Sequence, residues 1–86
     1  MPRLSRFYGI AVAMFYDDHP PPHFHARYGD HEALIGIVDL RVLAGSLPPK
    51  AMALVVEWAL LHQGELMDNW HRARRREPLV PIPPLV

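Results

Sequence analysis

Three consecutive prolines at positions 20–22 break the chain at a point that no helix or strand can cross. Proline has no backbone N–H to donate and restricts the residue before it, so a run of three interrupts both a strand ladder and a helix. Asp17 and Asp18, shortly before the run, are typical turn residues. Regular structure must therefore end before this segment and begin again after it, and the segment itself must be a loop.

Side chains on both sides of this loop show the two-residue alternation of β-strands. The pattern predicts strands over residues 7–16, 22–28 and 31–38, with 41–44 as an optional fourth. Both faces of 7–16 are apolar, so we expect that strand at the centre of its sheet. Gly29-Asp30 separates the second and third strands and predicts a tight hairpin.

The pattern changes to a helical one after Gly45. Ser46 is a candidate N-cap, and Pro48 and Pro49 fit the first helical turn, where missing donors do no harm. Apolar residues then recur at spacings of three, four or seven, which is one buried helix face: Met52, Val55, Val56, Ala59, Leu66, Trp70 and Ala73. We expect one long helix over 48–75, straight or bent at Gly64, with two helices that break at Gly64 as the alternative.

Together these elements predict an α+β fold in a single domain, residues 1–86. An antiparallel sheet of three or four strands would be followed by the long C-terminal helix, which covers one face. The tail, residues 77–86, is rich in proline and aliphatic side chains and too apolar for a solvated linker. It is expected to lie extended, in a groove of its own domain or against a partner.

Composition excludes several function classes. The absence of cysteine rules out disulfides, thiolate metal sites and cysteine nucleophiles, and it suits a cytoplasmic protein. The net charge of zero provides no overall field toward nucleic acid or an anionic membrane, so a nucleic-acid contact would have to be local, for example at Arg72–Arg76. No stretch reaches the roughly 18 apolar residues that span a bilayer, and the N-terminal segment lacks a signal-peptide cleavage site.

The residues best suited to chemistry gather in the run HPPPHFH, residues 19–25. His23 and His25 are two apart on a predicted strand, so their rings project from one face together with Arg27. Two imidazoles at this spacing can bind one divalent metal ion such as zinc, with His19 folding back as a third ligand. A further ligand could come from the neighbouring polar residues Asp17, Asp18, His31 or Glu32.

Two other interpretations of the run remain open. Without metal, His23 and His25 would act as general acid and base and Arg27 as a phosphate clamp, as in a metal-independent nuclease. In the structural interpretation, which we favour over the other two, the histidines form hydrogen bonds that hold the proline loop in place. Of the two tryptophans, Trp58 lies off the apolar helix stripe and is the better candidate for an exposed contact, although core packing is expected for both.

The order of these motifs resembles a known family. The segments PRLSRFYGI, MFYDDHPPPHFHARYGDHEALI, GSLPPKAMALVVEWALLHQGELMDNW and EPLVPIPPLV resemble a small bacterial family, domain of unknown function 4160, over nearly the whole chain. Gly64 departs from the family pattern, in which a helix-forming residue is usual at this position. The resemblance implies no particular reaction.

What the resemblance does imply is a role in a pair of proteins. Genes of this family often lie beside those of another short family, domain of unknown function 2442, in an arrangement that resembles a toxin–antitoxin pair. We therefore expect a protein-interaction component of a toxin–antitoxin-like or regulatory pair, whose partner is a small protein encoded nearby. Self-association through an exposed sheet edge is compatible with this role. The alternative is a metal-binding or metal-independent nuclease-type enzyme that uses His19, His23 and His25.

Overall fold

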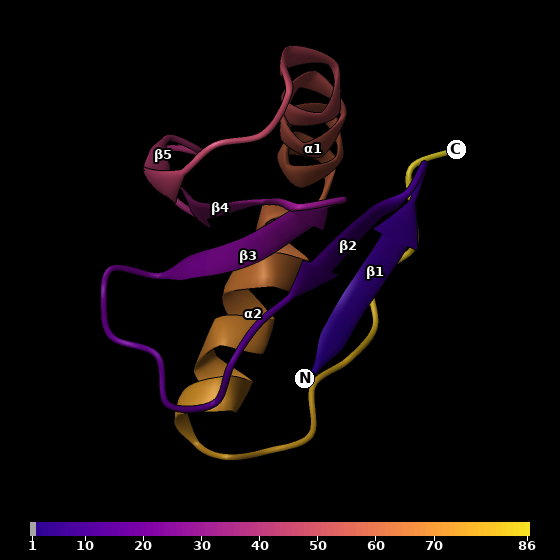
Figure 1. Ribbon diagram of the computed structural model, residues 1–86. Coiled ribbons are helices and arrows are strands. Elements are labelled where there is room, and N and C mark those ends of the chain that lie inside the picture. Colours follow the sequence, from indigo (N-terminus) through magenta and orange to yellow (C-terminus); the bar gives the residue numbers. More distant parts are fainter. Residues whose placement is uncertain (1) are drawn as a thin grey trace.

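The computed structural model describes residues 2–86, which form a five-stranded antiparallel sheet followed by two α-helices (Figure 1). The strands are β1 (Arg3–Phe7), β2 (Ile10–Ala13), β3 (His23–Tyr28), β4 (His31–Gly36) and β5 (Val42–Gly45), and the helices are α1 (Pro49–Leu61) and α2 (Gln63–Arg74). Each strand pairs with the next along the chain, in the order β1-β2-β3-β4-β5. The predicted sheet of three or four strands with one long helix is therefore wrong.

The extra strand arises because the expected strand 7–16 contains a hairpin turn. Tyr8 and Gly9 both have positive φ, at 49° and 79°, which is the geometry of a two-residue hairpin turn. Phe7 pairs with Ile10 across this turn, so β1 and β2 run side by side. Tyrosine rarely adopts positive φ and fits the apolar alternation, which is why the alternation alone did not reveal the turn.

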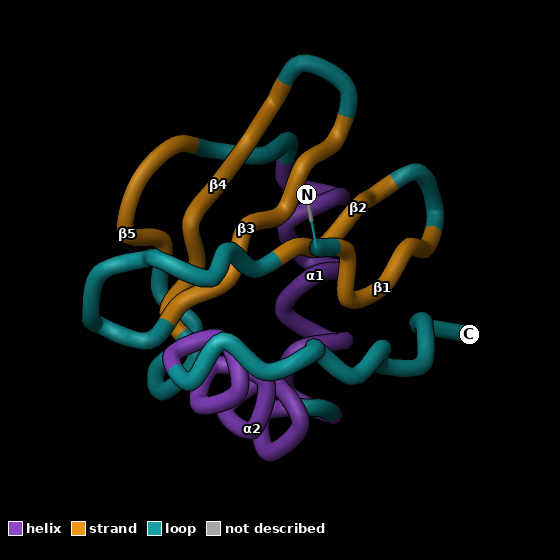
Figure 2. The backbone as a smooth tube through the Cα atoms, turned by 90° about the horizontal axis from the view of Figure 1, so that it is seen from below, coloured by secondary structure: helices purple, strands orange, loops and turns teal. Residues whose placement is uncertain are grey.

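The helical region is interrupted at His62 rather than at Gly64. The backbone of His62 has φ −130° and ψ 24°; its N–H donates to the carbonyl oxygen of Ala59, while its own carbonyl accepts from Leu66 at 2.9 Å. The two helices consequently point in different directions (Figures 1 and 2). The apolar stripe continues across the break because both helices bury a face in the same core. The expected N-cap, Ser46, is also wrong. Pro48 occupies the N-cap position of α1, and no described side chain caps the first turn of the helix with a hydrogen bond.

The core lies where the sheet meets the two helices. Its largest fully buried side chain is Trp58 of α1, whose ring centroid lies 5.3 Å from that of Phe7 and 6.1 Å from that of Phe24. Trp58 is thus a core residue rather than an exposed contact. Large aromatic rings in such a position supply much of the apolar area that a small domain can bury.

The C-terminal tail packs against its own fold. The N–H of Ile82 donates to the carbonyl oxygen of Leu4 in β1 at 2.8 Å, and Nε1–H of Trp58 donates to the carbonyl oxygen of Pro83 at 2.8 Å. Asn69 of α2 bonds to both backbone groups of Val80. The tail therefore runs alongside α2 and β1 (Figure 2).

Candidate metal centre

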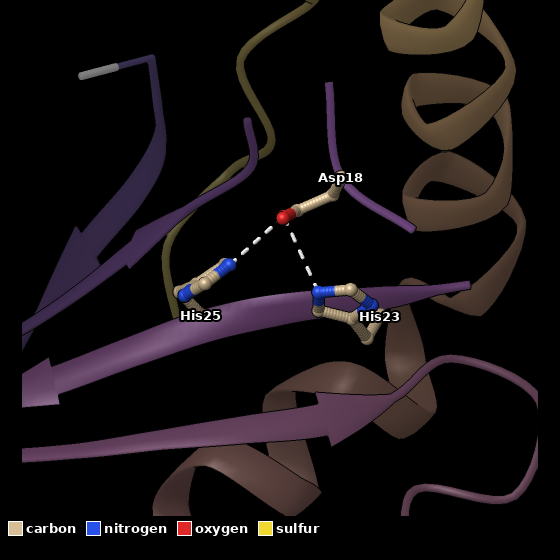
Figure 3. A group of neighbouring side chains, drawn as sticks. All are labelled: Asp18, His23 and His25. Atoms are coloured by element: carbon tan, nitrogen blue, oxygen red, sulfur yellow. Dashed lines mark hydrogen bonds and ion pairs between the residues drawn. The ribbon is translucent and has the colours of Figure 1, made fainter. Parts of the chain in front are cut away.

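The loop between β2 and β3 returns over the start of β3 and brings Asp18 to the two histidines of that strand (Figure 3). His23 is the first residue of β3 and His25 the third, so alternation places both rings on the same side of the strand. The carbonyl of Pro22 accepts a hydrogen bond from the N–H of Ile37, which ties the end of the loop to the chain after β4. This bond holds the end of the loop at the start of β3.

The three side chains converge on one carboxylate oxygen. Oδ2 of Asp18 lies 2.9 Å from Nε2 of His25 and 3.2 Å from Nε2 of His23. The contact with His25 has hydrogen-bond geometry. The contact with His23 does not, and Nε2 of His23 is buried without a hydrogen-bond partner among the described residues. One ligand atom from each residue lies within 4.8 Å of the other two.

The other nitrogen of each ring is held by a hydrogen-bond acceptor. Nδ1–H of His23 donates to the carbonyl oxygen of Pro21 at 2.8 Å, and Nδ1–H of His25 donates to Oε2 of Glu32 at 3.1 Å. Since a neutral imidazole carries one N–H, Nε2 of a neutral His23 ring presents a lone pair toward Asp18, whereas the hydrogen bond between Nε2 of His25 and Asp18 requires a proton on that nitrogen. A carboxylate also presents lone pairs, so the cluster requires either additional protons or a cation between the three groups.

The surroundings of Glu32 keep its carboxyl group ionised. The hydrogen bond from His25 is the main cause that lowers the pKa of the Glu32 carboxyl below its usual value. Partial burial opposes this effect, and a hydrogen bond and the charge of Arg27 add to the lowering. Glu32 is therefore an ionised acceptor that orients the His25 ring.

Aromatic rings clamp the two imidazoles. Phe15 meets His25 edge-on with ring centroids 4.5 Å apart, and Trp70 of α2 lies 5.4 Å from His23. Arg74 stacks over the Trp70 ring, and its Nη1 donates to the carbonyl oxygen of Asp18 at 3.1 Å. The loop is therefore anchored to the last turn of α2 as well as to the sheet.

The expected site residues are only partly brought together. His23 and His25 are adjacent, whereas His19 is exposed and lies outside the group of possible ligands found in residues 2–86. Arg27 is also exposed and pairs with Glu32 at 3.3 Å. Asp18, which the sequence suggested only as one of several optional ligands, is the residue on which both histidines converge.

Two hollows flank Asp18. One, of about 280 Å³, is mainly polar and includes His19, Arg74 and Arg76. Arg76 donates to Oδ1 of Asp17 at 2.6 Å, so one of the two arginines in this hollow is already paired with a carboxylate. The other, of about 290 Å³, includes His23 and is mainly apolar. A ligand bound next to Asp18 would thus adjoin a polar hollow on one side and an apolar hollow on the other.

An antiparallel meander backed by two helices, with two strand histidines and a loop aspartate, defines a small protein with a candidate metal centre. Comparison with known families then gives its place: the family described as "Domain of unknown function (DUF4160)" matches residues 9–71, and the chain belongs to this family. The resemblance noted from the sequence is thereby confirmed. The matched region contains the whole histidine run and most of both helices.

The remaining comparisons add no relative. No curated protein and no solved structure matches the chain. Across residues 2–86, neither helix has the length and apolar character that crossing a membrane would require.

Proposed function

We propose that the protein binds a divalent transition-metal ion through Nε2 of His23, Nε2 of His25 and a carboxylate oxygen of Asp18. The observation that carries the proposal is the state of His23. Its side chain is 7% exposed, its Nδ1–H is already donated, and its Nε2 faces a carboxylate oxygen at 3.2 Å without a hydrogen bond. A buried, unpartnered lone pair is costly, and a shared cation converts that cost into a bond.

The surroundings of both rings support the same proposal. Histidines that bind metal usually donate their second ring N–H to a carboxylate or a backbone carbonyl, which fixes the ring and raises its basicity. His25 donates to Glu32 and His23 donates to the carbonyl of Pro21. Each histidine therefore has a second hydrogen-bond partner of the kind found in metal sites, a carboxylate for His25 and a backbone carbonyl for His23.

The spacing of the donor atoms is compatible with a small ion. Ligands about 2.0–2.1 Å from a tetrahedral ion lie roughly 3.3 Å from one another. The two distances from Oδ2 of Asp18, 2.9 and 3.2 Å, are close to that value. Two imidazoles and one carboxylate suit zinc and also manganese, iron or nickel, and three protein ligands leave at least one coordination position open.

The metal-independent alternative has less support. A general acid or base needs a ring nitrogen that can reach a substrate, but both nitrogens of His25 face carboxylates and Nδ1 of His23 is engaged. Arg27, the proposed phosphate clamp, is paired with Glu32.

Metal content is the direct test. Protein purified without a histidine tag would be analysed by elemental mass spectrometry, then stripped with a chelator and titrated calorimetrically with zinc, manganese and nickel. We expect one ion per chain, with affinity at least 100-fold lower in D18N and H25A. Circular dichroism would verify that both variants fold.

Matched controls come from histidines outside the cluster. H19A and H31A remove exposed imidazoles and should leave affinity within about twofold of the wild type. The proposal is overturned if the stripped wild type takes up no ion at micromolar concentration. It is equally overturned if D18N and H25A bind as well as these controls.

We also propose, from the family resemblance, that the protein acts within a toxin–antitoxin-like or regulatory pair. Surface features that support a partner contact are the edge strand β5 and the exposed side chains of Leu60 and Leu61. Co-expression with the neighbouring gene product, followed by size-exclusion chromatography, tests this role. Two separate peaks at micromolar concentration would reject it.

A further inference from the structure

We infer that the ion completes its coordination with the oxygen-donor head of a small organic anion, whose apolar body lies in the hollow beside His23. This inference rests on the proposed metal site and names the class of ligand it would take. The hollow of about 290 Å³ has apolar walls formed by Pro20, Pro21, Leu34, Leu43 and Ala44. Its polar lining consists of Asp18, His19 and His23, two of which are proposed metal ligands.

Strand register explains why apolar side chains adjoin the cluster. His25 of β3 lies opposite Leu34 of β4, and Leu34 lies opposite Ala44 of β5. Residues directly opposite each other in an antiparallel sheet project from the same face. His25, Leu34 and Ala44 therefore form one row across the sheet, from a proposed metal ligand to two apolar residues. This row lies on one face of the sheet, and Phe24 packs against Trp58 on the other face.

The proline loop forms the facing wall of this hollow. Pro20 and Pro21 lie between Asp18 and His23 in the chain and line the same space as Leu34. Proline side chains are apolar, and their restricted backbone keeps the wall in place without a further loss of conformational entropy when a ligand binds. The hollow thus has two walls. The proline loop, which joins Asp18 to His23 in the chain, forms one, and strands β4 and β5, which continue the sheet from β3, form the other.

Charge favours an anionic head. A divalent ion bound by one carboxylate and two neutral imidazoles retains a net positive charge. The other nearby carboxylates are compensated, since Glu32 pairs with Arg27 and Asp17 pairs with Arg76. Arg74 adds a further positive charge where it bonds to the backbone of Asp18. An oxygen anion is therefore the preferred fourth ligand.

The hollow is open to solvent, and its walls can cover only a small apolar body. Binding sites for drug-sized ligands usually span about 300–1,000 Å³, so this hollow is at the small end. It suits a short aliphatic or single aromatic group rather than a macromolecule. A medium-chain or aromatic carboxylate combines the required head and body.

Straight-chain carboxylates from acetate to octanoate provide the test. Each would be titrated into cobalt-loaded protein, with binding followed by the visible spectrum of the ion and by calorimetry. We expect every carboxylate to change the spectrum, and affinity to rise roughly fourfold for each methylene until the hollow is filled. The metal-free protein should bind octanoate at least tenfold more weakly.

Two variants separate the hollow from the ion. L34S and L43S should weaken octanoate binding about tenfold, leave acetate binding unchanged and retain the cobalt affinity of the wild type. V86S removes an exposed valine at the end of the tail and should change none of these values.

The outcomes distinguish this inference from the metal site itself. If cobalt binds but acetate and octanoate have equal affinity, or if L34S weakens both equally, the inference is wrong and the metal site stands. Equal binding of octanoate to loaded and metal-free protein also overturns it. If no metal binds, both proposals fail together.

Discussion

Nε2 of His23 faces Oδ2 of Asp18 at 3.2 Å, and yet the two atoms form no hydrogen bond. The contact is held from both sides, because the carbonyl of Pro21 fixes the His23 ring while Arg74 bonds to the backbone of Asp18. The His23 ring cannot turn away without breaking its bond to Pro21 and losing its packing against Trp70. The Asp18 carboxylate is held by its hydrogen bond to His25. The fold thus brings two acceptors together, and either a proton on His23 or a bound cation would relieve their repulsion.

Metal should therefore stabilise the folded protein. At a free zinc concentration about 100 times the dissociation constant, binding to the native state alone adds about 2.7 kcal/mol to the free energy of unfolding. For a chain of this size that corresponds to a rise in Tm of about 10–20 °C. Differential scanning fluorimetry with zinc and with a chelator measures the difference. H25Q should show no rise, whereas H31Q should behave like the wild type; an equal rise in both variants would contradict the assignment.

The carboxylate behind His25 should tune metal affinity without being a ligand. E32Q keeps the shape of Glu32 but weakens its acceptance of the His25 Nδ1–H, and we expect a 10- to 100-fold loss of zinc affinity. R27M removes the ion pair to Glu32 without touching His25, so its effect should be smaller. E57Q alters an exposed carboxylate on α1 and should have none. Calorimetric titration of zinc into the wild type and the three variants ranks their affinities. A loss of affinity in E57Q equal to that in E32Q would refute the role of Glu32.

Gly45 should be the least replaceable glycine of the sheet. Its φ is 74°, and a Cβ there would overlap the backbone carbonyl of Glu32 in β4. G45A should lower the free energy of unfolding by about 2–5 kcal/mol, combining left-handed strain with the clash. Gly29 is the matched control, because its φ is 58° but the described residues place no atom within 4 Å of an added Cβ. G29A should lose only the strain, about 1–2 kcal/mol. Urea unfolding measures both, and equal losses would show that the clash is relieved.

The pair His23 and His25 was accessible from the sequence because strand alternation is a local property. Asp18 was not, since its place depends on how a proline-rich loop returns over the sheet, and no periodic pattern describes such a path. The strand and helix errors have the same origin. Tyr8 satisfies the alternation while turning the chain, and the apolar helix stripe passes through His62 because both helices pack on one core.

Asn69 should be the main anchor of the C-terminal tail. It is 1% exposed, its Nδ2 donates to the carbonyl of Val80 at 2.9 Å, and its Oδ1 accepts from the N–H of Val80 at 2.7 Å. N69L leaves both backbone groups without their partner, and we expect a loss of about 2–4 kcal/mol in the free energy of unfolding, with faster proteolysis of the tail. Q63A removes a more exposed amide that bonds to Ile37, and its loss should stay near 1 kcal/mol. Similar losses in the two variants would mean that Asn69 is not a special anchor.

Gly64 should be replaceable, because the helix break does not depend on it. It lies in the first turn of α2, without a positive φ, and an added Cβ would meet no described atom within 4 Å. Alanine restricts the unfolded chain and favours the helix, so G64A should raise the free energy of unfolding by roughly 0.5–1 kcal/mol. The break should persist at His62, whose carbonyl begins the hydrogen bonding of α2 through Leu66. Urea unfolding measures the gain, and amide hydrogen exchange at residues 60–66 shows whether the break remains. A loss of stability in G64A would instead mean that the freedom of glycine is needed to turn α1 into α2.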